Sequence, residues 1–312
     1  MANPRSLEIV CLGGATLDRK YRAAAPLAAA TSNPAVASVH FGGVARNVCE
    51  TLARLGVAAG LHSLAGDDAA GAALAAHLAA SGADVAGLRI LPGQATAEYA
   101  AVLEPAGELA LGLAAMAIFD SFGLADADAA LARKPAWIFA DCNLPPPVLR
   151  HLIAACRDSG QKLAIDGVSA PKIRRLPQDC DGIDTLFLNA DEAAALLGAE
   201  LPPVEAAARL RARGIANVVL TLGPDGLVVA PAGSVKHLHA RKIAVRDATG
   251  AGDALIAATL ARLLAGDILA TAAGIGANAA ALTLASADSV RPDLAQALAA
   301  RLAGDRTDAC RP

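Results

Sequence analysis

The sequence predicts an α/β fold in which a mainly parallel central sheet is flanked by helices, with a small separate β-sheet. Short apolar runs without charges recur along the chain, and segments with helical spacing lie between them. Hydrophobic residues make up 55% of the chain but aromatic residues only 3%, which favours helices packed on a parallel sheet over an aromatic-rich sandwich. By length, 312 residues fit one or two domains.

The expected strands are uncharged runs bounded by turn residues, and they lie at 9–12, 61–65, 137–140, 163–165, 186–188, 218–222 and 227–230. Helical spacing predicts helices at 45–55, 69–80, 148–156, 192–197, 204–213, 253–264 and 268–287. This alternation predicts parallel βαβ units with right-handed crossovers. Ligands of such sheets bind beyond the carboxyl ends of the strands.

Two regions interrupt the alternation. Residues 15–41 contain little helical pattern, and two extended runs, Tyr99–Leu103 and Leu109–Ile118, surround a turn at Pro105–Gly107. We expect a small sheet from segments at about 15–41 and 96–119. Because neither a linker nor an internal repeat divides the sequence, we expect residues 1–312 to form one domain with this sheet as a discontinuous lid.

Charge and cysteine content argue against several classes of protein. The chain has 27 basic and 30 acidic residues without a long basic block, which disfavours a nucleic-acid interface. Its six cysteines form no CxxC pair, so we expect reduced thiols in a cytoplasm, without a zinc site or disulfide framework. The first residues lack the apolar segment of an export signal.

One uncharged stretch, Ile268–Ala287, has the length of a membrane span. Its apolar residues are mostly alanine rather than leucine or isoleucine, with interspersed glycine, threonine and serine, and acidic residues flank it in place of basic or aromatic anchors. We therefore expect a buried core helix and no membrane partner.

The most informative motif is Asp-Ala-Thr-Gly-Ala-Gly-Asp at Asp247–Asp253, directly before an apolar helix. Its two glycines permit a tight turn whose N–H groups converge, and the helix adds its positive end, so the segment predicts an anion cradle. Asp253, in the first helical turn, would lie beside a bound phosphate and could accept a proton from an attacking hydroxyl. The alternative is that Asp253 merely caps the helix.

A second motif, Gly42-Gly43 followed by Asn47, opens the helix expected at 45–55. The diglycine lets a small polar ligand approach the backbone, and the Asn47 amide offers a donor and an acceptor to a hydroxyl. A simple helix start explains the pattern equally well. Asp18 follows the first strand and could accept hydrogen bonds from a diol, although a solvated loop carboxylate is the alternative.

Asn189 and Glu192 lie three residues apart after another apolar strand. They could hold a hydrated Mg²⁺ beside nucleotide phosphates, because this ion keeps most of its waters and needs few protein ligands. A capping box, with Asn189 as the cap, is the compatible alternative.

Together, Gly-Gly-x-x-x-Asn, Asn-x-x-Glu and Asp-x-Thr-Gly-Ala-Gly-Asp resemble the ribokinase (PfkB) family of carbohydrate and nucleoside kinases across essentially the whole chain. Within that family, the chain resembles the subgroup that phosphorylates pseudouridine, on the basis of segments 31–34, 40–47, 140–143 and 166–172. The resemblance implies a ribokinase-like three-layer fold with a β-sheet lid. It also implies transfer of phosphate from ATP, with Mg²⁺, to the 5′-hydroxyl of pseudouridine.

The same resemblance implies roles for individual residues. Asp253 would be the general base, while the amides of Gly250, Ala251 and Gly252 would stabilise charge on the transferred group. The nucleoside would contact Asp18, Gly42, Gly43, Asn47, Thr96, Tyr99, Asn143, Asp166 and Lys172. The nucleotide would contact Asn189, Thr221, Gly223, Gly226, Thr249 and Asn278. Asn189 and Glu192 would organise Mg²⁺ through water, and Asp247 with Thr249 would bind a monovalent cation such as K⁺.

The subgroup usually has proline at the position of Gly167, so the backbone after Asp166 is less constrained in this chain. Two alternatives to the pseudouridine assignment remain open. One is a kinase of the same family that acts on ribose, a hexose or another nucleoside such as adenosine. The other is a binding module without turnover, which the intact Asp253 disfavours. The family also implies a homodimer formed through the lid.

Overall fold

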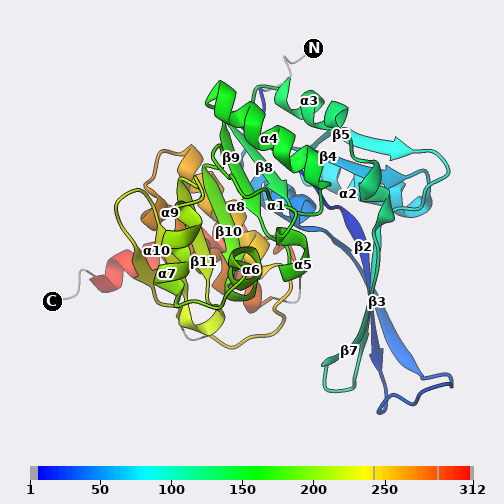
Figure 1. Cartoon of the computed structure of the whole chain (residues 1–312). Helices are drawn as coiled ribbons and strands as arrows, with labels where there is room; N and C mark the ends of the chain where they lie inside the picture. Colours follow the sequence, from blue (N-terminus) through cyan, green and yellow to red (C-terminus); the bar gives the residue numbers. More distant parts are fainter. Residues whose placement is uncertain (1–5, 242, 287, 310–312) are drawn as a thin grey trace.

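The computed structural model describes residues 6–241, 243–286 and 288–309. In this part of the chain, a nine-stranded sheet has the order β13-β12-β11-β10-β9-β8-β1-β4-β5 (Figure 1). Its strands are β1 (Ile9–Leu12), β4 (Ala59–Gly66), β5 (Asp84–Leu91), β8 (Trp137–Asp141), β9 (Lys162–Asp166), β10 (Thr185–Asn189), β11 (Asn217–Thr221), β12 (Leu227–Ala230) and β13 (Lys236–Leu238). All seven expected strands are confirmed, while β5 and β13 were not predicted.

The sheet is parallel from β5 to β11 and antiparallel at β12 and β13. The predicted mainly parallel sheet is confirmed, but the predicted run of parallel βαβ units does not continue to this edge. The reason is the short connection between β11 and β12, a single 3-10 turn η2 (Gly223–Asp225), which is long enough for a hairpin but not for a crossover helix.

Helices cover both faces of the large sheet and give three layers. One face packs on α3 (Leu124–Leu131), α4 (Pro146–Ser159), α5 (Ala170–Ile173), α6 (Ala190–Leu197) and α7 (Pro203–Arg211). The other packs on α1 (Val44–Arg54), α2 (Ala69–Ala80), α8 (Ala251–Leu264) and α9 (Leu269–Leu284), with α10 (Leu294–Ala309) outside α8 and α9. The seven expected helices are confirmed with shifts of a few residues. The α3, α5 and α10 helices were not predicted, since α5 is a single turn and the apolar spacing of α3 and α10 is weak.

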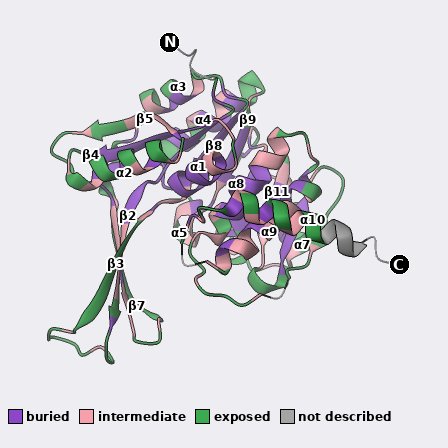
Figure 2. Cartoon of the chain, turned by 180° about the vertical axis from the view of Figure 1, so that it is seen from behind, coloured by how far each residue is buried: buried purple, intermediate pink, exposed green. Residues whose placement is uncertain are grey.

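The small sheet has four strands within the described residues, in the order β3-β2-β6-β7. They are β2 (Thr16–Ala23), β3 (Ala35–Gly42), β6 (Glu98–Leu103) and β7 (Leu109–Ala115). The extended run expected to reach Ile118 was too long, because the chain turns after Ala115 into the 3-10 helix η1 (Ala117–Ser121). The sheet projects from the body, and β7 and most of β3 are exposed (Figure 2).

The uncharged stretch near 268–287 forms α9, whose residues pack against β-strands and α8. Residue 287 lies outside the described part. Within the described residues, no helix combines the length and the apolar character that crossing a membrane requires. Five cysteines, Cys11, Cys49, Cys142, Cys156 and Cys180, are free and buried, whereas Cys310 lies outside the described residues.

Candidate active site

The amino terminus of α8 forms the expected turn at the carboxyl edge of the large sheet. Gly250 is the helix N-cap with a φ of 80°, and a Cβ built there would lie 1.9 Å from the carbonyl oxygen of Ser289. Only glycine fits both constraints. At Gly252, in contrast, an added Cβ would meet no protein atom within 4 Å. Packing does not demand glycine there, so the open space fits a ligand such as the phosphate chain of ATP, held at a helix amino terminus.

Asp253 lies in the first turn of α8 and contacts the other sequence motif. The Nδ2 atom of Asn47, in the first turns of α1, donates a hydrogen bond of 2.6 Å to Asp253 Oδ2. The helix cap is Gly250 without a side-chain cap bond, so the alternative that Asp253 is only a cap was wrong. Burial raises the pKa of Asp253 from 3.8 to about 6, against the hydrogen bond from Asn47 and the nearby charge of Arg46. A carboxylate with this pKa suits proton transfer near neutral pH.

Asn47 has a further property that fits a bound hydroxyl group. Its Oδ1 atom is buried and has no hydrogen-bond partner among the described residues. A buried polar atom without a partner is costly, and such groups occur where a ligand or water completes the contact. Asn47 can therefore hold Asp253 with its amide nitrogen and accept from a substrate hydroxyl with its oxygen.

The diglycine brings three chain segments into close contact. A Cβ at Gly42 would lie 2.2 Å from Asp18 Oδ2, and one at Gly43, where φ is 91°, would lie 2.4 Å from the carbonyl oxygen of Gly14. Asp18 accepts a 2.7 Å hydrogen bond from the Thr16 hydroxyl, and burial raises its pKa. The glycines thus let the Asp18 carboxylate approach the start of α1.

Arg46 anchors the junction between the small sheet and α1. Its guanidinium donates to the carbonyl oxygens of Phe41 and Gly42 at the end of β3, and it forms a 2.6 Å ion pair with Glu50. Both charges are buried, with side chains 2% exposed. A buried ion pair of this kind needs both partners, so Arg46 fixes where the small sheet leaves the body. The sequence analysis did not assign this role.

Asp141 is a second residue that the sequence analysis missed. It ends β8, is fully buried, and accepts backbone N–H bonds of 2.9 Å from Gly14, Ala45 and Asn143. The carboxylate therefore joins the loop after β1, the start of α1 and the loop after β8. A signal was present in the sequence, since Asp141 directly follows the apolar run 137–140 at the edge where ligands are expected.

Asn143 and Lys172 meet beside this cluster. Lys172 Nζ donates a 2.5 Å hydrogen bond to Asn143 Oδ1 and lies 3.7 Å from the sulfur of Met116. Burial lowers the pKa of Lys172. The Asn143 amide nitrogen lies 2.7 Å from the position of a Cβ at Gly14, on the loop that leads to the small sheet. The contact joins α5, which carries Lys172, to the loop after β8, which carries Asn143.

Asn189 and Glu192 form the capping box that was one of two compatible interpretations. The backbone N–H of Glu192 donates to Asn189 Oδ1 at 2.9 Å, and the backbone N–H of Asn189 donates to Glu192 Oε2 at 3.0 Å. Near Glu192, burial and then the charges of Glu192 and Asp253 raise the pKa of Asp166 well above its ordinary value.

Three carboxylates therefore lie in one region where a cation would relieve their repulsion. No group of three potential ligands among the described residues is close enough to bind a metal directly. This donor set fits Mg²⁺ held through its waters rather than a site built wholly from protein ligands.

The two residues expected to reach a base from the small sheet have contacts within the protein. The Thr96 hydroxyl donates to Asp68 Oδ1 at 2.6 Å and accepts from the backbone N–H of Gly66 at 3.0 Å. Thr96 thus fastens the start of β6 to α2. The Tyr99 hydroxyl lies over Gly112 of β7, 2.5 Å from where a Cβ would be.

Further residues that the sequence analysis expected to contact the nucleotide lie on β11, in or next to η2 and on α9. Thr221 ends β11 beside Asn189 of β10. Gly223 is the first residue of η2 and Gly226 follows it, with φ of 58° and 97°. Asn278, on α9, uses its amide within the protein: Nδ2 donates to Gly274 and Oδ1 accepts from Arg301. Both polar atoms of the Asn278 side chain thus have hydrogen-bond partners within the protein.

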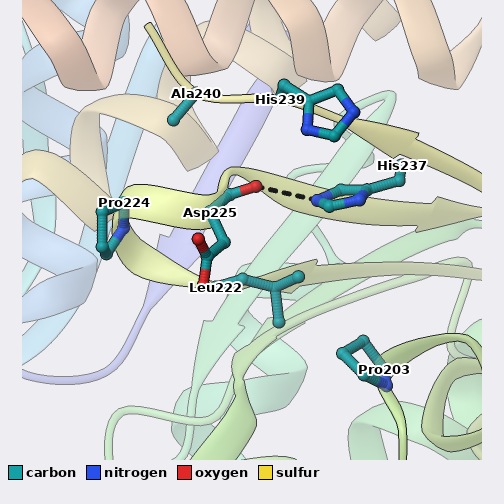
Figure 3. A pocket seen from close by; sticks show the side chains of 7 residues that line it. All are labelled: Pro203, Leu222, Pro224, Asp225, His237, His239 and Ala240. Atoms are coloured by element: carbon teal, nitrogen blue, oxygen red, sulfur yellow. Dashed lines mark hydrogen bonds between the residues drawn. The ribbon is translucent and has the colours of Figure 1, made fainter. Parts of the chain in front are cut away.

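A cavity of about 400 Å³ lies next to η2 (Figure 3). His237 Nε2 donates a 2.8 Å hydrogen bond to the carbonyl oxygen of Asp225 at its edge. The cavity contains neither Asp253 nor Asn47, so it is separate from the proton-transfer pair. Its lining residues are Pro203, Leu222, Pro224, Asp225, His237, His239 and Ala240.

The pair expected to bind a monovalent cation is already contacted by an amine. Lys20 Nζ, from β2, donates to Asp247 Oδ2 at 3.0 Å and to Thr249 Oγ1 at 3.1 Å. The Thr249 backbone N–H also donates to Asp247 Oδ1 at 2.8 Å. Asp247 and Thr249 therefore already have a cationic partner, Lys20, which the sequence analysis did not predict.

Taken together, the fold and the site define a class of protein. A glycine cradle at a helix amino terminus, a carboxylate beside it and a hydroxyl-binding amide can place a phosphate and an alcohol next to one another. This is the arrangement of a small-molecule kinase, a phosphotransferase with an alcohol group as acceptor.

Comparison with known proteins supports this class and gives the family. The model of the pfkB family carbohydrate kinases matches residues 6–294, and the chain belongs to this family. A pseudouridine kinase from Escherichia coli K12 is 31% identical over 257 residues, which cover 80% of this chain and 81% of the relative. A fructokinase from Klebsiella pneumoniae is 30% identical, with 82% of each chain covered. The structure of Arabidopsis thaliana ribokinase complexed with ribose and ATP has a TM-score of 0.80 at 19% identity, with 94% and 99% covered, which shows the ribokinase-like fold.

Proposed function

We propose that this kinase transfers the γ-phosphate of ATP to the 5′-hydroxyl of pseudouridine, with Asp253 as the general base. The observation that carries the proposal is the 2.6 Å hydrogen bond between Asn47 and Asp253, which joins the two sequence motifs across 206 residues. The unpartnered Oδ1 of Asn47 would accept from the substrate hydroxyl, and Asp253 would take its proton. The choice of pseudouridine is supported by the relative at 31% identity and by the subgroup motifs.

In this proposal, each group at the carboxyl edge has a separate task. Asp18 and the backbone at Gly42 and Gly43 hold the ribose, while Asn143 and Lys172 offer hydrogen bonds at the other end of the nucleoside. The N–H groups of the cradle at Gly250–Gly252 stabilise the charge on the transferred phosphoryl group. Bound Mg²⁺ would neutralise phosphate charge, and Asn189, Glu192 and Asp166 would hold its waters.

The small sheet would act as a lid over the acceptor. Asp18 and Lys20 lie two residues apart on β2, so their side chains share the face that looks toward α1 and α8. The opposite face carries Leu111 and Leu113, which are 53% and 56% exposed. An exposed apolar face is expected to be covered, and we propose that a second copy of the chain covers it to form a homodimer.

A substrate panel tests the function. Initial rates with ATP and Mg²⁺ are measured for pseudouridine, uridine, ribose, fructose and adenosine, and the site of phosphorylation is identified by ³¹P NMR. The proposal predicts the highest kcat/KM for pseudouridine and a 5′-phosphomonoester product. A higher kcat/KM for ribose or fructose would favour a sugar kinase of the same family, for which the fructokinase relative is the supporting observation. Tight ATP binding without turnover of any acceptor would favour a binding module.

A further inference from the structure

The small sheet delivers a positive charge to the loop that enters the anion cradle. Lys20 Nζ donates to Asp247 Oδ2 at 3.0 Å and to Thr249 Oγ1 at 3.1 Å, across more than 220 residues of sequence. Both members of the ion pair are half-buried, with side chains 29% and 32% exposed. Gly250, the first residue of the cradle, follows Thr249 directly. The ammonium group therefore lies beside the backbone that must hold the phosphate.

The orientation of Lys20 follows from the strand that carries it. Side chains alternate along a strand, so Lys20 shares a face with Asp18, and Arg19 points to the opposite face. Arg19 accordingly pairs with Glu98 inside the small sheet at 3.0 Å. Consecutive cations on β2 thus have different partners, one in the cradle loop and one within the sheet.

The loop around Asp247 is ordered by the same contacts. Asp247 Oδ1 accepts from the Thr249 backbone, and the Arg246 and Asp247 N–H groups donate to Leu284 of α9 at 2.8 and 3.3 Å. With Oδ2 engaged by Lys20, the carboxylate has one oxygen for the loop backbone and one for the ammonium. A monovalent metal ion placed on these oxygens would face the Lys20 charge at close range, where like charges repel.

The structure therefore disagrees with the expected metal site, and we propose that Lys20 replaces the monovalent cation in this protein. Like such an ion, the ammonium carries one positive charge and contacts several oxygens, but it is part of the chain. The conformation of the cradle then depends on the position of the small sheet rather than on dissolved K⁺. Lys20 is a positioning residue in this scheme, and its effect on turnover rests on the kinase function proposed above.

The test compares Lys20→Met with Arg19→Met, a matched variant that removes the neighbouring cation from the other face of β2. Kinase activity is measured over a range of KCl concentrations, with tetramethylammonium chloride keeping the ionic strength constant. A second readout needs no acceptor: the Tm of each protein is measured in KCl and in tetramethylammonium chloride. If the wild type showed no phosphotransfer activity, the proposed function would be contradicted, but the Tm comparison would still test the role of Lys20.

For wild type and for Arg19→Met, neither the activity nor the Tm is expected to change between the two salts. Lys20→Met is expected to lose about tenfold in kcat/KM without K⁺, as for a lost charge-assisted hydrogen bond, and to regain it as K⁺ is added. Its Tm should rise in KCl alone. Activation of the wild type by K⁺ would overturn the proposal. So would a Lys20→Met protein that is unimpaired without K⁺ or remains impaired at every K⁺ concentration.

Discussion

Replacing Asp253 with asparagine separates the catalytic value of this carboxylate from its cost to folding. Asparagine has nearly the same shape, and its Oδ1 can still accept the hydrogen bond that Asn47 Nδ2 donates to Asp253 Oδ2. The cradle at Gly250 and Gly252 is untouched, so ATP should bind with nearly unchanged affinity. What the variant loses is a negative charge and a proton acceptor.

The size of both effects follows from the site. Burial raises the pKa of Asp253 from 3.8 to about 6, so ionising it costs the folded state up to about 3 kcal/mol at neutral pH. Asparagine carries no such cost, and Asp253→Asn should be more stable than wild type above pH 6. The difference should shrink as the pH falls from 6 toward 4, because the folded state then binds a proton at Asp253 and no longer carries the buried charge, and it should vanish below pH 3.8, where both states are protonated. As the general base is lost, kcat should fall by about 10²- to 10⁴-fold.

Urea unfolding at pH 5 and pH 8, together with kcat and KM for ATP, measures both quantities. Glu205→Gln is the control, because Glu205 lies in the first turn of α7 with an exposed carboxylate that pairs with Arg209, itself exposed. It should change stability by no more than about 0.5 kcal/mol and leave kcat unaltered. An Asp253→Asn protein that turns over at the wild-type rate, or that is less stable than wild type at pH 8, would refute the reasoning.

Three further predictions concern the cradle and the small sheet. Gly250→Ala should lose at least about 1–2 kcal/mol of stability from its left-handed backbone alone, whereas Gly252→Ala should keep or raise stability yet lower kcat, because its methyl group enters the space assigned to phosphate. Urea unfolding and kinetics on both variants check this. Leu111→Glu combined with Leu113→Glu should shift the protein from dimer to monomer in light scattering. A coupled assay without acceptor should find ATP hydrolysis at a small fraction of the kinase rate, since the lid is expected to exclude water; vigorous hydrolysis would contradict lid closure.

The sequence was sufficient for the parts of the fold that depend on local pattern. Buried parallel strands such as Leu186–Leu188 are uncharged runs, and the αL turn at Gly250 is marked by its glycine. The edge at β12 and β13 was predicted less well, because an apolar run does not show its direction. That direction depends on the length of the connection, which here is the short turn η2.

The site was predictable where backbone conformation demands a residue type, and less so where side chains meet across the fold. The turn into α8 could be placed from its glycines, but the 2.6 Å contact of Asn47 with Asp253 required the packing of α1 on α8. Lys20 gave no signal, since a lysine on a strand is ordinarily solvated. Its contact with Asp247 depends on how the small sheet is oriented.

The pH dependence of kcat/KM tests the central claim most directly, namely that Asp253 accepts the proton of the acceptor hydroxyl. The base must be ionised, so the rate with pseudouridine should rise through a single titration with an apparent pKa near 6 and level off above pH 7. The residual rate of Asp253→Asn should lack this rise. A wild-type profile that is flat from pH 5 to 8, or a rise that persists in Asp253→Asn, would contradict the assignment.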